Sequence, residues 1–174
     1  MKFKCHPDWA ISQIWLTQAS FAGQIPIEIS SMTRLVTLDL STPHFEGPFC
    51  LKIENPNLSS FLTNVTLLWE LCLDGVSISA HGNAWYQSLS SSLPKLQVFS
   101  LAQYFLLGPI HPSLANLQSL SEIYLDNINL SSTIPEFLAD FSNLTSFISA
   151  SVGCTGSFLK KNSKYQYLDY WLVI

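Results

Sequence analysis

A unit of 24 residues recurs along the chain and limits the folds open to it. Its clearest copy is Phe21–Leu40, FAGQIPIEISSMTRLVTLDL, in which F-x-G-x-I-P predicts a tight extended turn. The L-x-x-L-x-L run at its end alternates like a short strand with one buried face. Ile29 and Met32 supply apolar residues between these two parts. One such unit cannot bury its own apolar face, so it requires a copy of itself on either side.

Six copies of the unit align. Positions within a copy are called slots here and are counted from the first leucine or isoleucine of its L-x-x-L-x-L run. The fourth slot is apolar in every copy, and the thirteenth holds only Gly, Ala or Ser. A fixed period in the twenties with this leucine spacing indicates a leucine-rich-repeat solenoid. The copies begin at Ile11, Leu35, Leu68, Leu96, Leu120 and Leu144.

We therefore predict an α/β repeat solenoid, a right-handed superhelix with a concave parallel β-sheet and an irregular convex side. Residues 1–10 stay unassigned, and the repeats fill residues 11–174. Short helical turns are expected near residues 59–64 and 84–91. The strands should centre on residues 14–16, 38–40, 71–73, 99–101, 123–125 and 147–149.

Two copies depart from the regular period. The second exceeds it by nine residues, and there Leu51 and Ile53 predict one more short extended pair, with Ser59 as the N-cap of a helical turn. In the third copy, Trp85 and Leu89 lie four apart and should share the core-facing side of a helix. A truncated seventh repeat begins near residues 165–168, in one of two registers. These are Leu168, Trp171 and Val173, or Tyr165, Leu168 and Tyr170.

Charge and hydropathy restrict the partners. The net charge of −4, with no basic stripe, argues against nucleic acid. The longest apolar runs, such as Tyr104–Leu107 and Tyr170–Ile174, fall far short of the about 18 residues of a membrane span, so we expect no span in this chain. His6, Pro7 and Asp8 interrupt the first apolar stretch, and we interpret the N-terminus as lacking a signal peptide.

Residues able to carry catalysis are scattered through the repeats. The histidines fall at unrelated slots, the glycines are single, and the cysteines have neither C-x-x-C nor metal spacing. We therefore predict a protein that is not an enzyme, with no catalytic residues, no cofactor and no metal. Repeat register points Cys72 outward and Cys154 inward, which favours free thiols over a disulfide. The residues considered are His6, His44, His81, His111, Cys5, Cys50, Cys72 and Cys154.

Residues between the strand leucines point away from the core and form columns on the concave face. One group is acidic, aromatics stand beside it, and Lys and Arg are absent from these slots. We hypothesise a binding surface for a basic or polar peptide or protein, and the alternative is a solvated polar face. The residues of this candidate site are Trp15, Asp39, Trp69, Glu70, Asp74, Glu122, Tyr124 and Asp126.

The L-x-x-L-x-x-L-x-L-x-x-N-x-L-x-G-x-I-P unit resembles the ectodomains of plant leucine-rich-repeat receptor-like proteins and receptor-like kinases. The stretches ENPNLSSFLTNVT and LDGVSISAHGNAW resemble the verticillium-wilt-resistance type most closely. The resemblance implies a plasma-membrane receptor with extracellular repeats, a role in pathogen defence, and a protein or peptide ligand with a co-receptor. It also favours N-glycosylation at the four sequons, Asn57, Asn64, Asn129 and Asn143.

The chain departs from this family pattern in two ways. The ninth slot lacks the usual Asn, so we expect unpaired backbone groups between repeats. The chain matches only an early block of repeats, so we expect a fragment: either a binding module of a receptor or a non-functional remnant of its gene. We also expect self-association through uncapped ends. The ninth slot holds Ala19, Pro43, Val76, Tyr104, Ile128 and Val152.

Overall fold

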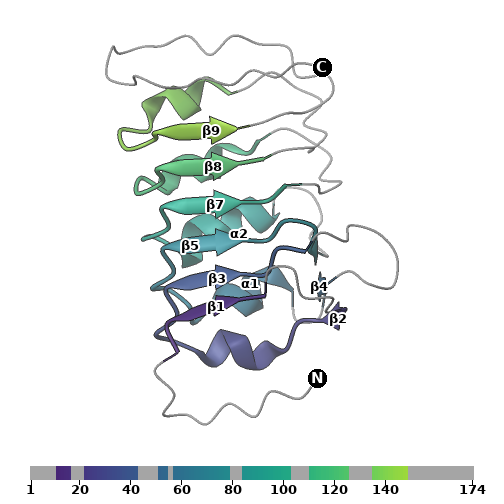
Figure 1. Ribbon diagram of the computed structural model, residues 1–174. Coiled ribbons are helices and arrows are strands. Elements are labelled where there is room, and N and C mark those ends of the chain that lie inside the picture. The colour runs from purple at the N-terminus through teal and green to yellow at the C-terminus, as the bar shows by residue number, and fades with distance from the viewer. Residues whose placement is uncertain are drawn as a thin grey trace.

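A six-stranded parallel sheet, with one strand from each repeat, dominates the computed structural model of the chain (Figure 1). The structure describes residues 11–16, 22–42, 51–54, 57–78, 84–102, 110–125 and 135–148. The predicted solenoid is confirmed, although each strand begins one residue before its predicted segment. The strands, in spatial order, are β1 (Gln13–Trp15), β3 (Thr37–Asp39), β5 (Glu70–Cys72), β7 (Val98–Ser100), β8 (Glu122–Tyr124) and β9 (Ser146–Ile148).

The strands pair in the register that the repeat predicts. Leu38 lies opposite Leu71, which lies opposite Phe99, so each fourth-slot residue stacks on its counterpart. In the second slot, the N–H of Gln97 donates to the carbonyl of Trp69 in the preceding repeat at 2.8 Å. The same bond recurs in each described repeat from the second copy to the sixth. The period of the sequence is therefore the period of the hydrogen-bond ladder.

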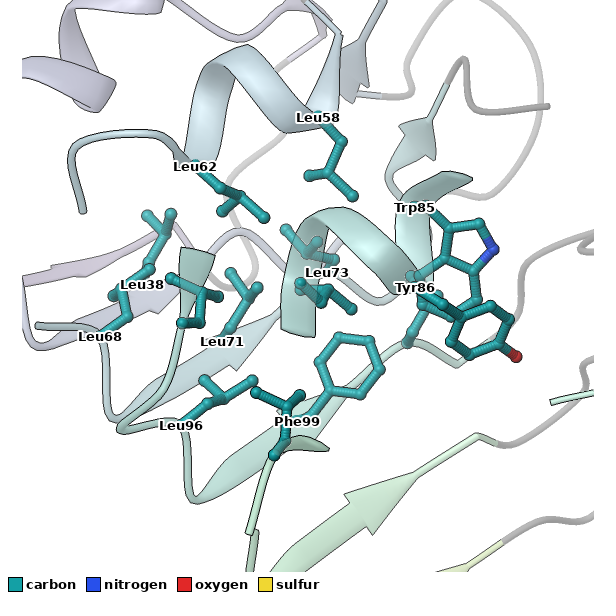
Figure 2. Close-up of a cluster of buried hydrophobic side chains, with 14 of the residues drawn as sticks. Leu38, Leu58, Leu62, Leu68, Leu71, Leu73, Trp85, Tyr86, Leu96 and Phe99 are labelled. Carbon is teal, nitrogen blue, oxygen red and sulfur yellow. The ribbon is translucent and has the colours of Figure 1, made fainter. Parts of the chain in front are cut away.

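The core lies between the sheet and the opposite side of each repeat (Figure 2). Leu71 and Phe99 from neighbouring strands are fully buried there. Trp85 closes the core from the other side, and its ring centroid lies 3.5 Å from that of Tyr86 and 6.2 Å from that of Phe99. Trp85 and Leu89 are both buried, which confirms the predicted core-facing side of this helix.

Short helices line the side opposite the large sheet. Helix α1 packs against η1 and α2, and η3 packs against α2 and η4. The two predicted helical turns are confirmed, but Ser59 is not the N-cap. Asn57 holds that position, because its Oδ1 accepts from the N–H of Ser60 at 3.0 Å. The helices are η1 (Ile27–Ser31), α1 (Leu58–Leu62), α2 (Ala84–Ser92), η3 (Pro112–Asn116) and η4 (Glu136–Asp140).

The first three repeats also form a second parallel sheet of three strands. Each of its strands comes after the large-sheet strand of the same repeat along the chain. The second sheet contains β2 (Gly23–Gln24), β4 (Leu51–Ile53) and β6 (Ser77–Ile78) in that order. The extended pair predicted at Leu51 and Ile53 is confirmed as β4, which is the central strand. The sheet pairs backbone groups that follow the ninth slot in each of these repeats. At Val76, the one ninth-slot residue that the structure describes, the buried N–H donates to the Leu73 carbonyl at 3.1 Å.

Several sequence predictions fall outside the described residues. These concern Asp126, Asn129, the other five ninth-slot residues, Cys5, Cys50, Cys154, and both registers of the seventh repeat. Among the described residues, no helix is both long enough and apolar enough to cross a bilayer.

Candidate functional site

The candidate site is the outer surface of the six-stranded sheet, here called the sheet face. Its residues alternate with the buried leucines along each strand, because successive side chains of a strand point to opposite sides. The strand register aligns them in two columns. The third-slot column contains Gln13, Thr37, Glu70, Val98, Glu122 and Ser146, and the fifth-slot column contains Trp15, Asp39, Cys72, Ser100, Tyr124 and Ile148.

Two of the predicted acidic residues lie on β5 and β8 in the expected register. Glu70 and Glu122 occupy the same slot two strands apart, with Val98 of β7 between them. Parallel strands lie about 4.8 Å apart, so the two positions are about 10 Å apart. The structure thus brings together Asp39, Glu70 and Asp74 on adjacent repeats, while Glu122 lies farther along the same face.

Asp74 is more deeply engaged than the sequence indicated. Its Oδ1 accepts from the N–H of Ala102 and from the hydroxyl of Ser100, each at 2.7 Å. Its Oδ2 accepts from the hydroxyl of Ser41 at 3.4 Å. The carboxylate therefore joins the repeats before and after its own. The partner residues are common serines and an alanine, so no sequence motif identified this contact.

Two other carboxylates of the sheet face are held by their neighbours. Asp39 accepts from the N–H of Ser41 at 2.9 Å through Oδ1. Glu122 accepts from the hydroxyl of Tyr124 through Oε2. That bond raises the pKa of Tyr124, with burial and the charge of Glu122 as further causes. Tyr124 is consequently a neutral hydrogen-bonded ring at physiological pH.

Cys72 lies among the acidic residues as a free, half-buried thiol. Burial raises its pKa, and the negative charges of Asp39, Glu70 and Asp74 raise it further. Its Sγ contacts Glu70 Oε1 at 3.9 Å. A thiol held protonated in this way is a poor nucleophile, because the reactive form is the thiolate.

Two exposed tryptophans border the acidic residues. Trp15 on β1 is 60% exposed, and Trp69, directly before β5, is 42% exposed. Tryptophan is enriched where proteins bind one another, because its large ring combines apolar area with a polar N–H. No Lys or Arg side chain belongs to either column of the described sheet face. The surface is therefore acidic and aromatic.

Outside the sheet face, His111 has a structural role. His111 lies on the helix side, where its Nδ1 accepts from the N–H of Ser113 at 3.1 Å and caps η3. No group of three or more His, Cys, Asp or Glu residues among the described ones is arranged to hold a metal ion. Three of the predicted sequon residues, Asn57, Asn64 and Asn143, are exposed and lie outside the strands of the sheet face.

Two plant proteins are similar in sequence. Receptor-like protein 6 of Arabidopsis thaliana is 33% identical over 136 residues, which cover 77% of this chain. Receptor-like protein 41 of the same species is 25% identical over 140 residues, or 70% of this chain. The chain spans only 13% and 15% of the lengths of these relatives. No protein-family model matches the chain.

Solved structures with this fold come from proteins of several kinds. The PEPR1–AtPEP1 structure matches 80% of this chain at 25% identity with a TM-score of 0.57. The match covers 18% of the chain in that structure. A second structure is that of the Arabidopsis receptor kinase HAESA in complex with the peptide hormone IDA and the co-receptor SERK1. It matches 86% of this chain at 21% identity with a TM-score of 0.60, and the match covers 27% of the chain in that structure. A Listeria monocytogenes internalin matches 85% at 20% identity and the same TM-score of 0.60, with 38% coverage. The chain is a leucine-rich-repeat protein, and its homologues include Arabidopsis receptor-like proteins.

Proposed function

We propose that this leucine-rich-repeat chain is a recognition module of a plant receptor-like protein, and that its sheet face binds a basic, partly apolar peptide or protein segment. The homology to receptor-like proteins supports the receptor context. The fold by itself does not select a ligand, because an internalin shares it equally well. The observation that carries the proposal is the acidic and aromatic surface across β1, β3, β5 and β8.

Geometry favours a cationic ligand at this surface. One carboxylate oxygen of Asp39 and one of Glu122 accept an internal hydrogen bond. The second oxygen of each carboxylate accepts none from the described residues. Those internal bonds orient the carboxylates before a ligand arrives, which reduces the entropy lost on binding. The carboxylates are partly exposed and are reached by salt, so binding through them should be weak and salt-sensitive.

The tryptophans favour a ligand with apolar side chains as well. Trp69 offers a large rigid surface beside the strand that carries Glu70. Aromatic side chains provide such contact area at a low entropic cost. HAESA, which has this fold, holds a peptide hormone and a co-receptor in its crystal structure, so the fold is compatible with ligands of this size. We extend the proposal to a cell-surface location, a role in defence signalling and a protein co-receptor.

The test compares matched charge removals on the two sides of the solenoid. One variant carries Glu70→Gln and Glu122→Gln on the sheet face. The control carries Glu28→Gln and Glu136→Gln, two exposed residues of η1 and η4 on the helix side. Both variants lose two negative charges, one pair from the sheet face and the other from the helix side.

The probe is a positional library of extended twelve-residue peptides, screened at low and at high salt. We expect enrichment of Lys or Arg together with apolar residues. The sheet-face variant should bind the selected peptides about fivefold more weakly at low salt, because each exposed ion pair contributes about 0.2–1 kcal/mol. The control should bind like the parent. Equal binding by both variants would show that the acidic columns are only a solvated surface.

A further inference from the structure

The helix side of the second and third repeats has a chemistry unlike that of the sheet face. Neither α1 nor α2 contains a charged residue. Several hydroxyls are turned back onto the helices, with Thr63 Oγ1 donating to the Ser59 carbonyl and Ser88 Oγ to the Ala84 carbonyl, each at 2.9 Å. This uncharged surface, here called the helix face, exposes Asn57, Ser59, Ser60, Thr63, Asn64, Ala84, Gln87 and Ser91.

Asn57 is the residue of the helix face whose two amide atoms have different roles. Its Oδ1 accepts from the N–H of Ser60 at 3.0 Å and caps α1. Its Nδ2 makes no recorded hydrogen bond within the described chain, and the residue is exposed. Asn57, Leu58 and Ser59 form a glycosylation sequon. The capping atom and the atom that would carry a sugar are therefore separate.

The other described sequons contrast in how the asparagine amide is used. Asn64 is exposed in the turn directly after α1, and its sequon ends at Thr66. Asn143 lies before β9, and its Nδ2 donates to the carbonyl of Gln118 in the preceding repeat at 3.1 Å. The Asn143 amide nitrogen thus already joins two repeats, whereas Asn57 and Asn64 have no such recorded bond.

We infer that Asn57 and Asn64 are N-linked glycan sites, and that Asn57 caps α1 while it carries its glycan. This inference rests on the proposed function, because the modification requires entry into the secretory route. In the transfer, Nδ2 loses a proton and forms a bond to the anomeric carbon of a polyprenyl-diphosphate-linked oligosaccharide. The bond from that carbon to the diphosphate oxygen breaks, and the polyprenyl diphosphate leaves. Oδ1 remains a carbonyl oxygen and continues to accept the bond from Ser60.

The position of these sites separates the two faces. Both asparagines flank α1, on the side of the repeat opposite the six-stranded sheet (Figure 1). Glycans there cover a surface without charged helix residues and leave the acidic sheet face open. The helix face is then the shielded side of the module, and the sheet face is the side that meets a protein ligand.

The experiment expresses the full chain behind a secretion signal in plant cells. Site occupancy is measured by mass spectrometry after enzymatic deglycosylation in ¹⁸O-labelled water, which marks each formerly glycosylated asparagine. We expect occupancy at Asn57 and Asn64. Ser59→Ala should remove only the first glycan, and Thr66→Ala only the second. A secreted chain that is unmodified at Asn57, with or without glycans elsewhere, overturns the inference.

Three variants separate the cap from the glycan. Ser59→Ala loses the sequon and keeps the Asn cap, Asn57→Asp loses the sequon and keeps a capping oxygen, and Asn57→Ala loses both. We expect the first two to melt together and Asn57→Ala to melt about 2–4 °C lower. Equal melting of all three overturns the double role. Peptide binding is measured separately with the Glu70 and Glu122 variants, so normal occupancy without peptide binding rejects the proposed ligand alone.

Discussion

At the scale of single residues, Asp74 shows how a surface carboxylate can belong to the fold. One of its oxygens is shared between the N–H of Ala102 and the hydroxyl of Ser100, which are both in the next repeat. The sequence predicted Asp74 as part of the binding columns, on the same basis as Glu70. The structure distinguishes the two, because among the described residues Asp74 has three internal partners and Glu70 has only the weak contact with Cys72.

We predict that Asp74→Ala destabilises the chain by about 2–3 kcal/mol, because it leaves the Ala102 N–H without its acceptor and removes a charge-assisted bond. Asp74→Asn keeps a carbonyl oxygen in place and should cost about 1 kcal/mol. Urea denaturation followed by circular dichroism measures both. Asp140→Ala in η4 is the control, since this exposed residue should leave stability unchanged within about 0.5 kcal/mol. Equal stabilities for Asp74→Ala and the control would contradict the linking role.

At the scale of elements, the second sheet depends on an unusual backbone conformation. Gly23 opens β2 with φ of 100°, in the region that L side chains rarely adopt. A Cβ built there meets no atom within 4 Å, so a substitution is limited by the backbone and not by space. Gly23 therefore sets the direction in which β2 reaches β4.

We expect Gly23→Ala to destabilise the chain by about 1–2 kcal/mol through this conformational cost alone. The neighbouring exposed Ala22 provides the control, and Ala22→Ser should be nearly neutral. Hydrogen exchange at the Ile25 N–H, which donates to the Lys52 carbonyl at 2.8 Å, reports on the pairing of β2 with β4. Unchanged exchange together with unchanged stability would show that the positive φ is not required.

At the scale of the whole molecule, the stack of repeats is buried best in its middle. Ile14 and Phe147 at the two ends are only partly buried, whereas Leu71 and Phe99 in the middle are fully buried. The strand β1 also forms one edge of the six-stranded sheet. In later repeats the second-slot N–H donates to the preceding repeat, and no described residue accepts from the N–H of Ser12.

We predict that the chain in isolation self-associates through the β1 edge, because an unpaired strand edge pairs readily with another chain. Ser12→Pro removes the outward N–H and keeps the Ser12 carbonyl, which accepts from Val36 at 2.7 Å. Sedimentation velocity over a range of concentrations should show less association for Ser12→Pro than for the control Ser12→Ala. A parent chain that sediments as a monomer at all concentrations would disprove this prediction.

The sequence determined the solenoid, the strand positions to within one residue and the residues that form the sheet face. These follow from periodicity, since an apolar residue that recurs every 24 positions must stack on its copies to leave water. The spacing of Trp85 and Leu89 likewise predicted the core-facing side of α2, because two residues four apart lie on one side of a helix.

Tertiary structure alone decided which polar groups meet. The Asp74 carboxylate finds Ser41, Ser100 and Ala102, which lie in the repeats before and after its own. The second sheet likewise forms only when three irregular segments lie side by side. A hydrogen bond depends on distances of a few tenths of an ångström between groups far apart in the chain, and no local pattern encodes those distances. Apolar burial tolerates looser placement, which is why the sequence predicted the core better than the site.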